Sequence, residues 1–256
     1  MADQKEVELV HIVQDACSDD GTLRWLPHDP RVRAFIEKDA GMYDAVNRGF
    51  KRADGEILAY LNCDEQYLPG GLKAVGDFFA THPSIEVLLA GTIVIDETGN
   101  YICHRPSLIP HPYYMFFHFP VLSSSIFLRR RVIHTRGILF DPHWRDLGDL
   151  HWVRTLLANK VPMAVFDHFT SAFTDTGKNM ALKPNALRER QETFAMAPQW
   201  VRYQRYFART HHFLRKMFAG HFSLSPTNYS IYTLQSPDRR VVFNVPKATT
   251  VWWNRM

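Results

Sequence analysis

The sequence has few cysteines, and their spacing excludes two common uses of this residue. Its 256 residues include only Cys17, Cys63 and Cys103, an odd number with no Cys-x-x-Cys pair. A disulfide framework and a structural zinc site both need paired cysteines at suitable spacing, so neither is predicted. Cys63 lies beside Asp64, where we expect a small half-buried side chain and not a nucleophile.

Long apolar runs are also absent. No stretch approaches the roughly 20 residues of a membrane-spanning helix, and residues 1–6, Met-Ala-Asp-Gln-Lys-Glu, lack the apolar region of a signal peptide. We therefore expect a cytoplasmic protein. With 46% hydrophobic and 22% charged residues, the chain is long enough for one large α/β domain, alone or with a C-terminal appendage.

Acidic residues are scarce between residues 181 and 220, although the net charge of the whole chain is a mild +4. This segment has two, Glu189 and Glu192, against eight basic residues: Lys183, Arg188, Arg190, Arg202, Arg205, Arg209, Arg215 and Lys216. Its second predicted helix, residues 199–218, interleaves aromatic residues with arginines. Such a helix lies on an anionic membrane surface or docks with its neighbour on the domain, and the pattern allows both interpretations. A partner nucleic acid is not predicted.

The most informative stretch is residues 53–72. An apolar run, Ile57–Leu61, predicts a strand and stops at Asn-Cys-Asp-Glu, which contains Asp64. Ligands of open α/β sheets bind beyond the carboxyl ends of the strands, where an aspartate can bind a Mg²⁺-like ion that also holds a diphosphate. The alternative is a strand followed by an acidic surface turn.

Further polar residues follow the first two predicted strands. Residues 8–13 predict a strand with Asp15 at its tip, on the same side of a parallel sheet as Asp64. A shorter strand at 32–36 leads to a loop containing Asp39, and the next helix carries Asn47 on its polar face. These side chains either cap turns and face solvent or line a ligand site.

The remaining pattern alternates strands and helices. Helices are predicted at 71–80, 185–196 and 199–218, strands at 85–90, 121–128 and 162–166, and hairpins at 92–103 and around 236–239. Residues 106–120 are rich in proline and aromatics and either line an acceptor pocket or pack on the sheet. Asp149 falls at the start of a helix whose apolar stripe includes Leu150, Val153 and Leu156, where it is an N-cap or a functional carboxylate.

Taken in order, these segments resemble glycosyltransferase family 2, enzymes with a GT-A fold that transfer sugars from nucleotide-diphosphate donors. The resemblance covers about residues 8–189, and its matching runs are 13–22, 39–49, 55–65, and 140–141 with Asp149 and Arg154. It implies an α/β fold with a GT-A-like mixed, mostly parallel sheet flanked by helices. We expect the nucleotide-sugar-binding and catalytic domain in residues 1–180 and a helical and hairpin extension in residues 181–256.

The resemblance also implies a role for individual residues. Asp15 would contact the base of the donor, and Asp39 and Asn47 would line the nucleotide or diphosphate pocket. Asp64 would bind Mg²⁺ or Mn²⁺ within a variant of the family's Asp-x-Asp motif, and Asp149 would be the general base. A metal on the diphosphate stabilises the leaving group while a carboxylate removes the proton of the acceptor hydroxyl, and a single displacement inverts the anomeric centre.

The expected activity is therefore a metal-dependent glycosyltransferase of the hexosyltransferase type. Its expected partners are a nucleotide-sugar, with UDP-sugars first, and a saccharide or lipid-linked acceptor in cell-surface polysaccharide or glycolipid synthesis. A peripheral contact with the inner face of the membrane is expected through residues 181–220.

One departure from the family concerns the sheet. Family members have a strand and a helix before the position of Glu8, and that strand would be central, so we expect unpaired edges where it is absent. The alternative function is a catalytically impaired relative that acts as a binding or partner module. A nucleotidyltransferase would need a glycine-rich phosphate loop near the N-terminus, and none is found.

Overall fold

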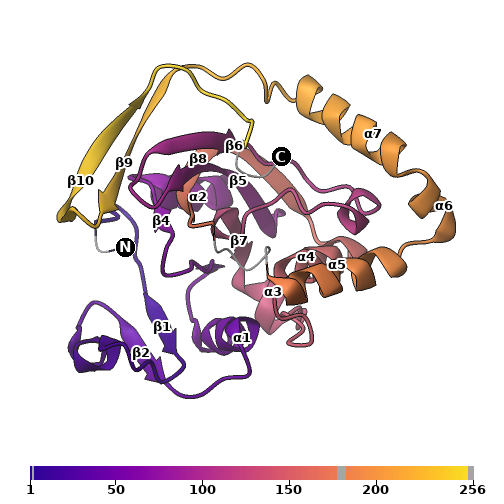
Figure 1. The fold of residues 1–256 in the computed structure, drawn as a ribbon. Helices are drawn as coiled ribbons and strands as arrows, with labels where there is room; N and C mark the ends of the chain where they lie inside the picture. Colours follow the sequence, from indigo (N-terminus) through magenta and orange to yellow (C-terminus); the bar gives the residue numbers. More distant parts are fainter. Residues whose placement is uncertain (2, 178–182, 253–256) are drawn as a thin grey trace.

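The computed structural model describes residues 1, 3–177 and 183–252 (Figure 1). Its strands are β1 (Ile12–Asp15), β2 (Arg33–Ile36), β3 (Ile57–Leu58), β4 (Gln66–Tyr67), β5 (Val87–Asp96), β6 (Tyr101–Arg105), β7 (Ile126–Arg129), β8 (Met163–Asp175), β9 (Thr227–Thr233) and β10 (Ser236–Val245). Its helices are α1 (Met42–Arg52), α2 (Gly71–Thr81), α3 (Arg130–His134), α4 (Gly148–Ala158), α5 (Pro184–Ala195), α6 (Gln199–Tyr203) and α7 (Arg205–Phe218). Short 3-10 turns are formed by Thr22–Arg24, Leu26–His28, Tyr114–Phe116 and Ser123–Ser125.

Strand β5 is the centre of a six-stranded sheet. The strand order is β3-β7-β5-β8-β4, with β6 paired to the second half of β5. Val87 and Leu89 of β5 pack in one buried cluster and Leu88 and Ala90 in another, because successive side chains of a strand point to opposite faces. Both faces of the sheet are therefore covered.

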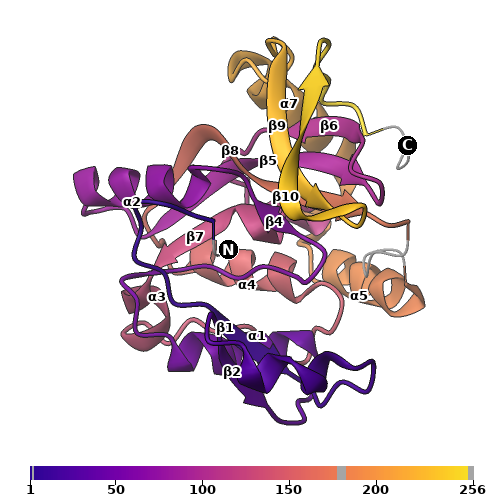
Figure 2. The same ribbon diagram turned by 90° about the vertical axis from the view of Figure 1, so that its left-hand side faces the viewer.

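Helices supply the cover on each face. Helices α1, α3 and α4 contribute Phe50, Val132 and Trp152 to the larger cluster, and α2 contributes Val75 and Phe79 to the other. Figure 2 shows α1, α3 and α4 together on one side of the molecule. The stripe predicted for α4 is confirmed, since Leu150, Val153 and Leu156 are buried.

The sheet is mixed, as expected, but antiparallel pairs outnumber parallel ones among the described strands. In the six-stranded sheet β5–β8 is parallel, whereas β3–β7, β5–β7, β5–β6 and β4–β8 are antiparallel. The other parallel pair, β1–β2, forms a sheet of its own. No described strand is hydrogen-bonded to both β1 and β3, so the parallel pair stays separate from the central strands.

Several elements have different limits from those predicted. Strand β3 has only two residues, Ile57 and Leu58, which are the two that pair with β7. The strand predicted at 85–90 and the first strand of the hairpin predicted at 92–103 form one continuous strand, Val87–Asp96. Strand β8 runs on to Asp175 because it pairs in parallel with the whole of β5. The predicted helix at 199–218 is interrupted at Gln204.

The C-terminal hairpin shares a core with the sheet. Tyr229, Ile231 and Val245 of β9 and β10 pack with Ile93 and Ile95 of β5. The predicted division between residues 180 and 181 lies outside the described residues. Among the helices that the structure describes, none combines the length and apolarity needed to cross a membrane.

Candidate active site

Asp149 is the second residue of α4, as the sequence predicts. Its Oδ1 accepts a hydrogen bond of 2.8 Å from the backbone N–H of Leu150. A helix N-terminus favours a negative charge, but desolvation outweighs this effect and, with a smaller contribution from the charge of Glu189, raises the pKa of Asp149 to about 6. A carboxylate with a pKa near neutral is suited to accept a proton.

The ring of Tyr43 packs against the start of α4. A Cβ atom at position 148 would lie 2.5 Å from the ring's Cδ2 atom, so this approach requires Gly148. The ring also stacks on Phe140, with 4.9 Å between centroids. The Tyr43 hydroxyl lies beside the Asp149 carboxylate. Burial raises the pKa of this hydroxyl, and the charge of Asp149 acts in the same direction.

Glu189 of α5 binds the loop that precedes α4. Its carboxylate accepts hydrogen bonds from the backbone N–H groups of Arg145 (2.8 Å), Asp146 (3.1 Å) and Leu147 (2.8 Å). The side chain is fully buried on α5, and Asn185 Nδ2 donates to it at 2.8 Å. The segment that leads into Asp149 is thus fixed by a residue about 40 positions later in the chain.

The Asn47 side chain is hydrogen-bonded to the backbone of Phe140. Its Nδ2 donates to the Phe140 carbonyl at 2.8 Å, and its Oδ1 accepts from the Phe140 N–H at 2.9 Å. The side chain is 6% exposed. This pairing ties α1 to the segment before α4, so Asn47 acts as a positioning residue for Asp149, and its contact with a donor stays a prediction.

Glu65, in the acidic cluster after β3, lies within electrostatic range of Asp149. Burial is the main reason that the pKa of Glu65 is raised to about 7, and the charges of Asp64 and Asp149 act in the same direction. Glu65 Oε2 accepts from the Asn62 N–H at 2.9 Å. Its Oε1 is buried without a hydrogen-bond partner among the described residues, whereas the Asp64 side chain is exposed.

Asp15 and Asp39 lie together at the carboxyl end of the β1–β2 pair. Asp15 ends β1, and its two oxygens accept from the N–H (2.8 Å) and hydroxyl (2.7 Å) of Ser18. Asp39 accepts from the Gly41 N–H at 2.9 Å in the loop after β2. Both side chains therefore cap turns in the structure, and their contact with a donor stays a prediction.

The model of one protein family matches the first half of the sequence, which includes the acidic cluster but not α4. The family described as "Glycosyl transferase family 2" matches residues 2–138, more than half of the chain. The chain belongs to glycosyl transferase family 2.

Two named relatives support the assignment to family 2. The chain is 27% identical over 99 residues to "Uncharacterized glycosyltransferase RC0461" of Rickettsia conorii, a match covering 38% of this chain and 16% of that protein. It is 33% identical over 79 residues to "Amylovoran biosynthesis glycosyltransferase AmsE" of Erwinia amylovora, covering 30% of this chain and 29% of AmsE. The matched stretches thus span less than a third of either relative.

Solved structures of S. aureus TarS have the same fold as this family 2 chain. The TarS 1–349 complex with UDP superposes with a TM-score of 0.56 at 18% identity, covering 88% of this chain and 66% of that one. The complex with UDP-GlcNAc gives 0.58 at 17% identity, covering 86% and 68%. At these identities the likeness shows the fold alone, and it confirms the expected GT-A-like α/β class.

The aromatic loop of this family 2 chain, residues 106–120, is partly buried. Tyr114 and Met115 are buried, and the Arg154 guanidinium lies 4.1 Å from the centroid of the Phe116 ring. Tyr113 is exposed and meets Trp200 of α6 edge-on at 4.7 Å. The loop therefore packs on the domain, as one interpretation predicts, and an acceptor pocket along it stays a prediction.

Two residues of this site, Glu65 and Glu189, have a role that the sequence pattern does not predict. Glu65 follows the predicted ligand Asp64 directly, and a second acid after a strand was the available signal. Glu189 is one of only two acids between residues 181 and 220. Its isolation among basic residues was the signal, but only the tertiary structure brings it to the α4 loop.

Asp64 and Glu65 suit a cation whose other ligands come from a bound molecule such as a diphosphate. Among the described residues no group of three or more His, Cys, Asp or Glu side chains could hold a metal by itself. Mg²⁺-like ions are often bound by one or two carboxylates together with phosphate oxygens. The exposed Asp64 and the unpartnered Oε1 of Glu65 suit that pattern.

Proposed function

We propose that this family 2 protein is an inverting glycosyltransferase that moves a sugar from a nucleotide-diphosphate donor to a hydroxyl acceptor. The proposal rests on Asp149, a half-buried carboxylate at the start of α4, whose raised pKa suits a general base and whose charge acts on Glu65, the neighbour of Asp64. One carboxylate would face the acceptor while the acidic pair faces the diphosphate.

The reaction is a single displacement with Asp149 as base. The acceptor oxygen forms a bond to the anomeric carbon as the bond from that carbon to the diphosphate oxygen breaks. The nucleoside diphosphate leaves with the electron pair, and the hydroxyl proton passes to Asp149. Tyr43 and Glu189 keep the carboxylate in place during this transfer, since they contact Gly148 and Leu147, the two residues that precede it.

The proposed donor is a UDP-sugar and the proposed acceptor a saccharide or lipid-linked saccharide. TarS, which shares the fold, is solved with UDP and with UDP-GlcNAc. AmsE, which shares a short stretch of sequence, is named for amylovoran biosynthesis. These relatives support a role in the synthesis of a surface polysaccharide.

Asp64, with Glu65 beside it, is the proposed site of Mg²⁺ or Mn²⁺. A bound cation would neutralise charge that develops on the departing diphosphate. The raised pKa of Glu65 follows from burial next to Asp64, and a cation would lower it again.

Hydrolysis of nucleotide-sugars tests the proposal, because many transferases slowly pass the donor sugar to water. We expect the full chain to hydrolyse one UDP-sugar with Mn²⁺. Asp149→Asn should lower that rate by about a hundredfold or more because it removes the base, while UDP binding followed by calorimetry is unchanged. Asp64→Asn should weaken Mn²⁺-dependent UDP binding.

The matched control is Asp77→Asn on α2, where the carboxylate pairs with Lys73 at the surface. This variant should retain the rate and the binding. If no nucleotide-sugar is hydrolysed, none shifts the melting temperature with Mn²⁺, and all three variants behave alike, the chain is a binding module and not a transferase.

A further inference from the structure

The outer face of α6 and α7 carries a group of exposed apolar side chains. Tyr203, Phe207 and Phe218 are 78%, 69% and 82% exposed. The other large exposed apolar side chains of this segment are Trp200, Tyr206, Phe213, Leu214, Met217 and Phe222. Burying apolar residues normally stabilises a fold, so a face with this many exposed aromatic rings indicates an external binding surface.

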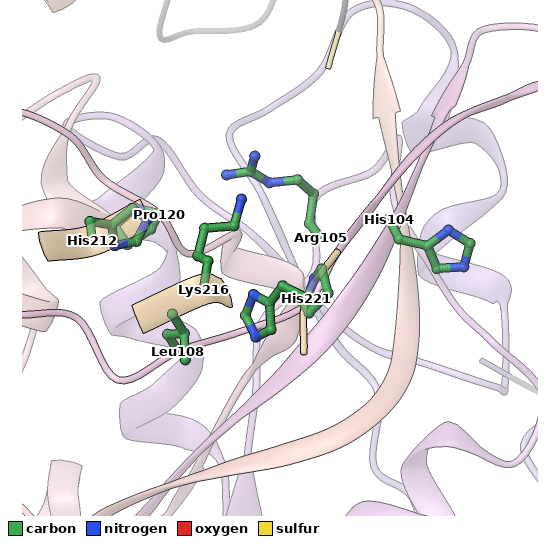
Figure 3. A pocket seen from close by; sticks show the side chains of 8 residues that line it. His104, Arg105, Leu108, Pro120, His212, Lys216 and His221 are labelled. Atoms are coloured by element: carbon green, nitrogen blue, oxygen red, sulfur yellow. The ribbon is translucent and has the colours of Figure 1, made fainter. Parts of the chain in front are cut away.

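Helix α7 is oriented with its polar side toward the protein. His212 stacks on Tyr114, with ring centroids 4.1 Å apart, and Arg215 donates to the Ile109 carbonyl at 2.8 Å. Lys216 lines a pocket with Arg105, and Figure 3 shows both side chains projecting into the same space. These contacts fix the basic side of the helix on the loop after β6, which leaves its apolar side facing outward.

The helix lies at the periphery of the molecule. Figure 1 shows α6 and α7 along the outer edge, beyond the loop on which they pack. The side chains at 206, 213 and 217 recur at helical spacing and share one face with Leu214 and Phe218. The face is therefore a continuous stripe that a flat surface can contact.

The charge around this stripe has one sign. No Asp or Glu occurs between Glu192 and Asp238. Exposed Arg202, Arg205 and Arg209 lie on α6 and α7 next to the aromatic residues. A complementary surface offers an apolar layer to the aromatic rings and negative charges to the arginines. A bilayer that contains anionic lipids has both properties.

We propose that the outer face of α6 and α7 binds the surface of an anionic membrane, with its aromatic side chains at the level of the lipid headgroups. Trp, Tyr and Phe with flanking arginines are the residues that favour this interface. The binding is peripheral, and it does not depend on the proposed sugar transfer.

Sedimentation with lipid vesicles tests the proposal. We expect the full chain to bind vesicles of phosphatidylcholine mixed with phosphatidylglycerol and to bind phosphatidylcholine alone much more weakly. Phe207→Ser with Phe218→Ser should weaken binding by more than about tenfold because it removes two inserted rings. Arg205→Gln with Arg209→Gln should weaken binding to the mixed vesicles by about thirtyfold, and high salt should have a similar effect.

The matched control removes two exposed apolar side chains elsewhere. Leu234 and Val242 on the β9–β10 hairpin are 94% and 64% exposed, and their double change to serine should leave vesicle binding intact. Circular dichroism and melting temperature should match those of the native chain in every variant. Equal binding by the Phe207→Ser, Phe218→Ser variant overturns the proposal, and so does a stable dimer in solution that this variant converts to a monomer, because a second copy would then cover the face.

Discussion

The start of α4 and the outer face of α7 differ in how firmly the fold holds their side chains. At the start of α4, Tyr43 packs on Gly148 and three backbone N–H groups are bound by Glu189. On α7 the rings of Phe207 and Phe218 are mostly exposed. Both regions are built from elements far apart in the chain, yet only the first has its functional atoms fixed from several sides.

The difference follows from what each region has to do. A general base must hold one position relative to a reacting hydroxyl, and small displacements are costly in rate. A membrane-binding face needs apolar area and charge but tolerates variation in the side chains that provide them. Substitutions should therefore destabilise the fold strongly at the first region and weakly at the second.

The largest expected effect is that of Glu189→Ala. It leaves three backbone N–H groups without their acceptor, one of them buried and two partly buried, so the free energy of unfolding should fall by about 4 kcal/mol, with loss of turnover. The control is Glu192→Ala on the same helix, where a surface pair with Arg188 contributes less than about 0.5 kcal/mol. Urea unfolding measures both, and equal effects of the two changes would contradict the role given to Glu189.

Gly148→Ala should have the next largest effect. The added methyl group would overlap the Tyr43 ring, and moving that ring disturbs its stack on Phe140, at a cost of about 3 kcal/mol. Gly76→Ala on α2 has open space around the new methyl group and should stabilise the protein by up to about 1 kcal/mol. A neutral Gly148→Ala would show that the Tyr43 contact is dispensable.

Glu65→Gln should change the pH dependence of stability. The pKa of Glu65 is raised from 4.5 to about 7 in the folded protein, so the native chain loses stability as the pH rises through this interval. The variant has no such loss and should be more stable by about 3 kcal/mol at pH 8 and no different at pH 4. Melting temperatures across this range measure the difference, and an equal offset at both pH values would contradict the buried, protonatable state of Glu65.

The smallest expected effect is on the stability of the α7 variant. Phe207→Ser with Phe218→Ser should change the free energy of unfolding by less than about 0.5 kcal/mol, because exposed side chains contribute little to the fold. Thermal or urea unfolding without lipid measures this value. A large loss of stability would mean that these rings pack on the protein, and it would remove the contrast with the start of α4.

The family and most elements could be predicted because the signals are local. The apolar stripe of α4 and the loop around 97–100 that joins β5 to β6 depend on residues only a few positions apart, and Asp15 at the tip of β1 follows directly from a strand pattern. The prediction was less accurate for the length of β8 and the balance of parallel and antiparallel pairs. Those depend on which strands meet, and pairing energies act over long separations in sequence.

The sequence alone determined which residues can carry charge and roughly where strands and helices occur, and this was enough to propose Asp64 and Asp149 as site residues and to relate the chain to a family. Only the tertiary structure decided that Asn47 faces Phe140, that Glu189 binds the α4 loop, and that the apolar side of α7 faces outward. Helical periodicity specifies that a face exists but not which way it points, because burial is decided by the neighbour that packs against it. The same polar side chain can then serve the fold or a ligand, depending on its neighbour.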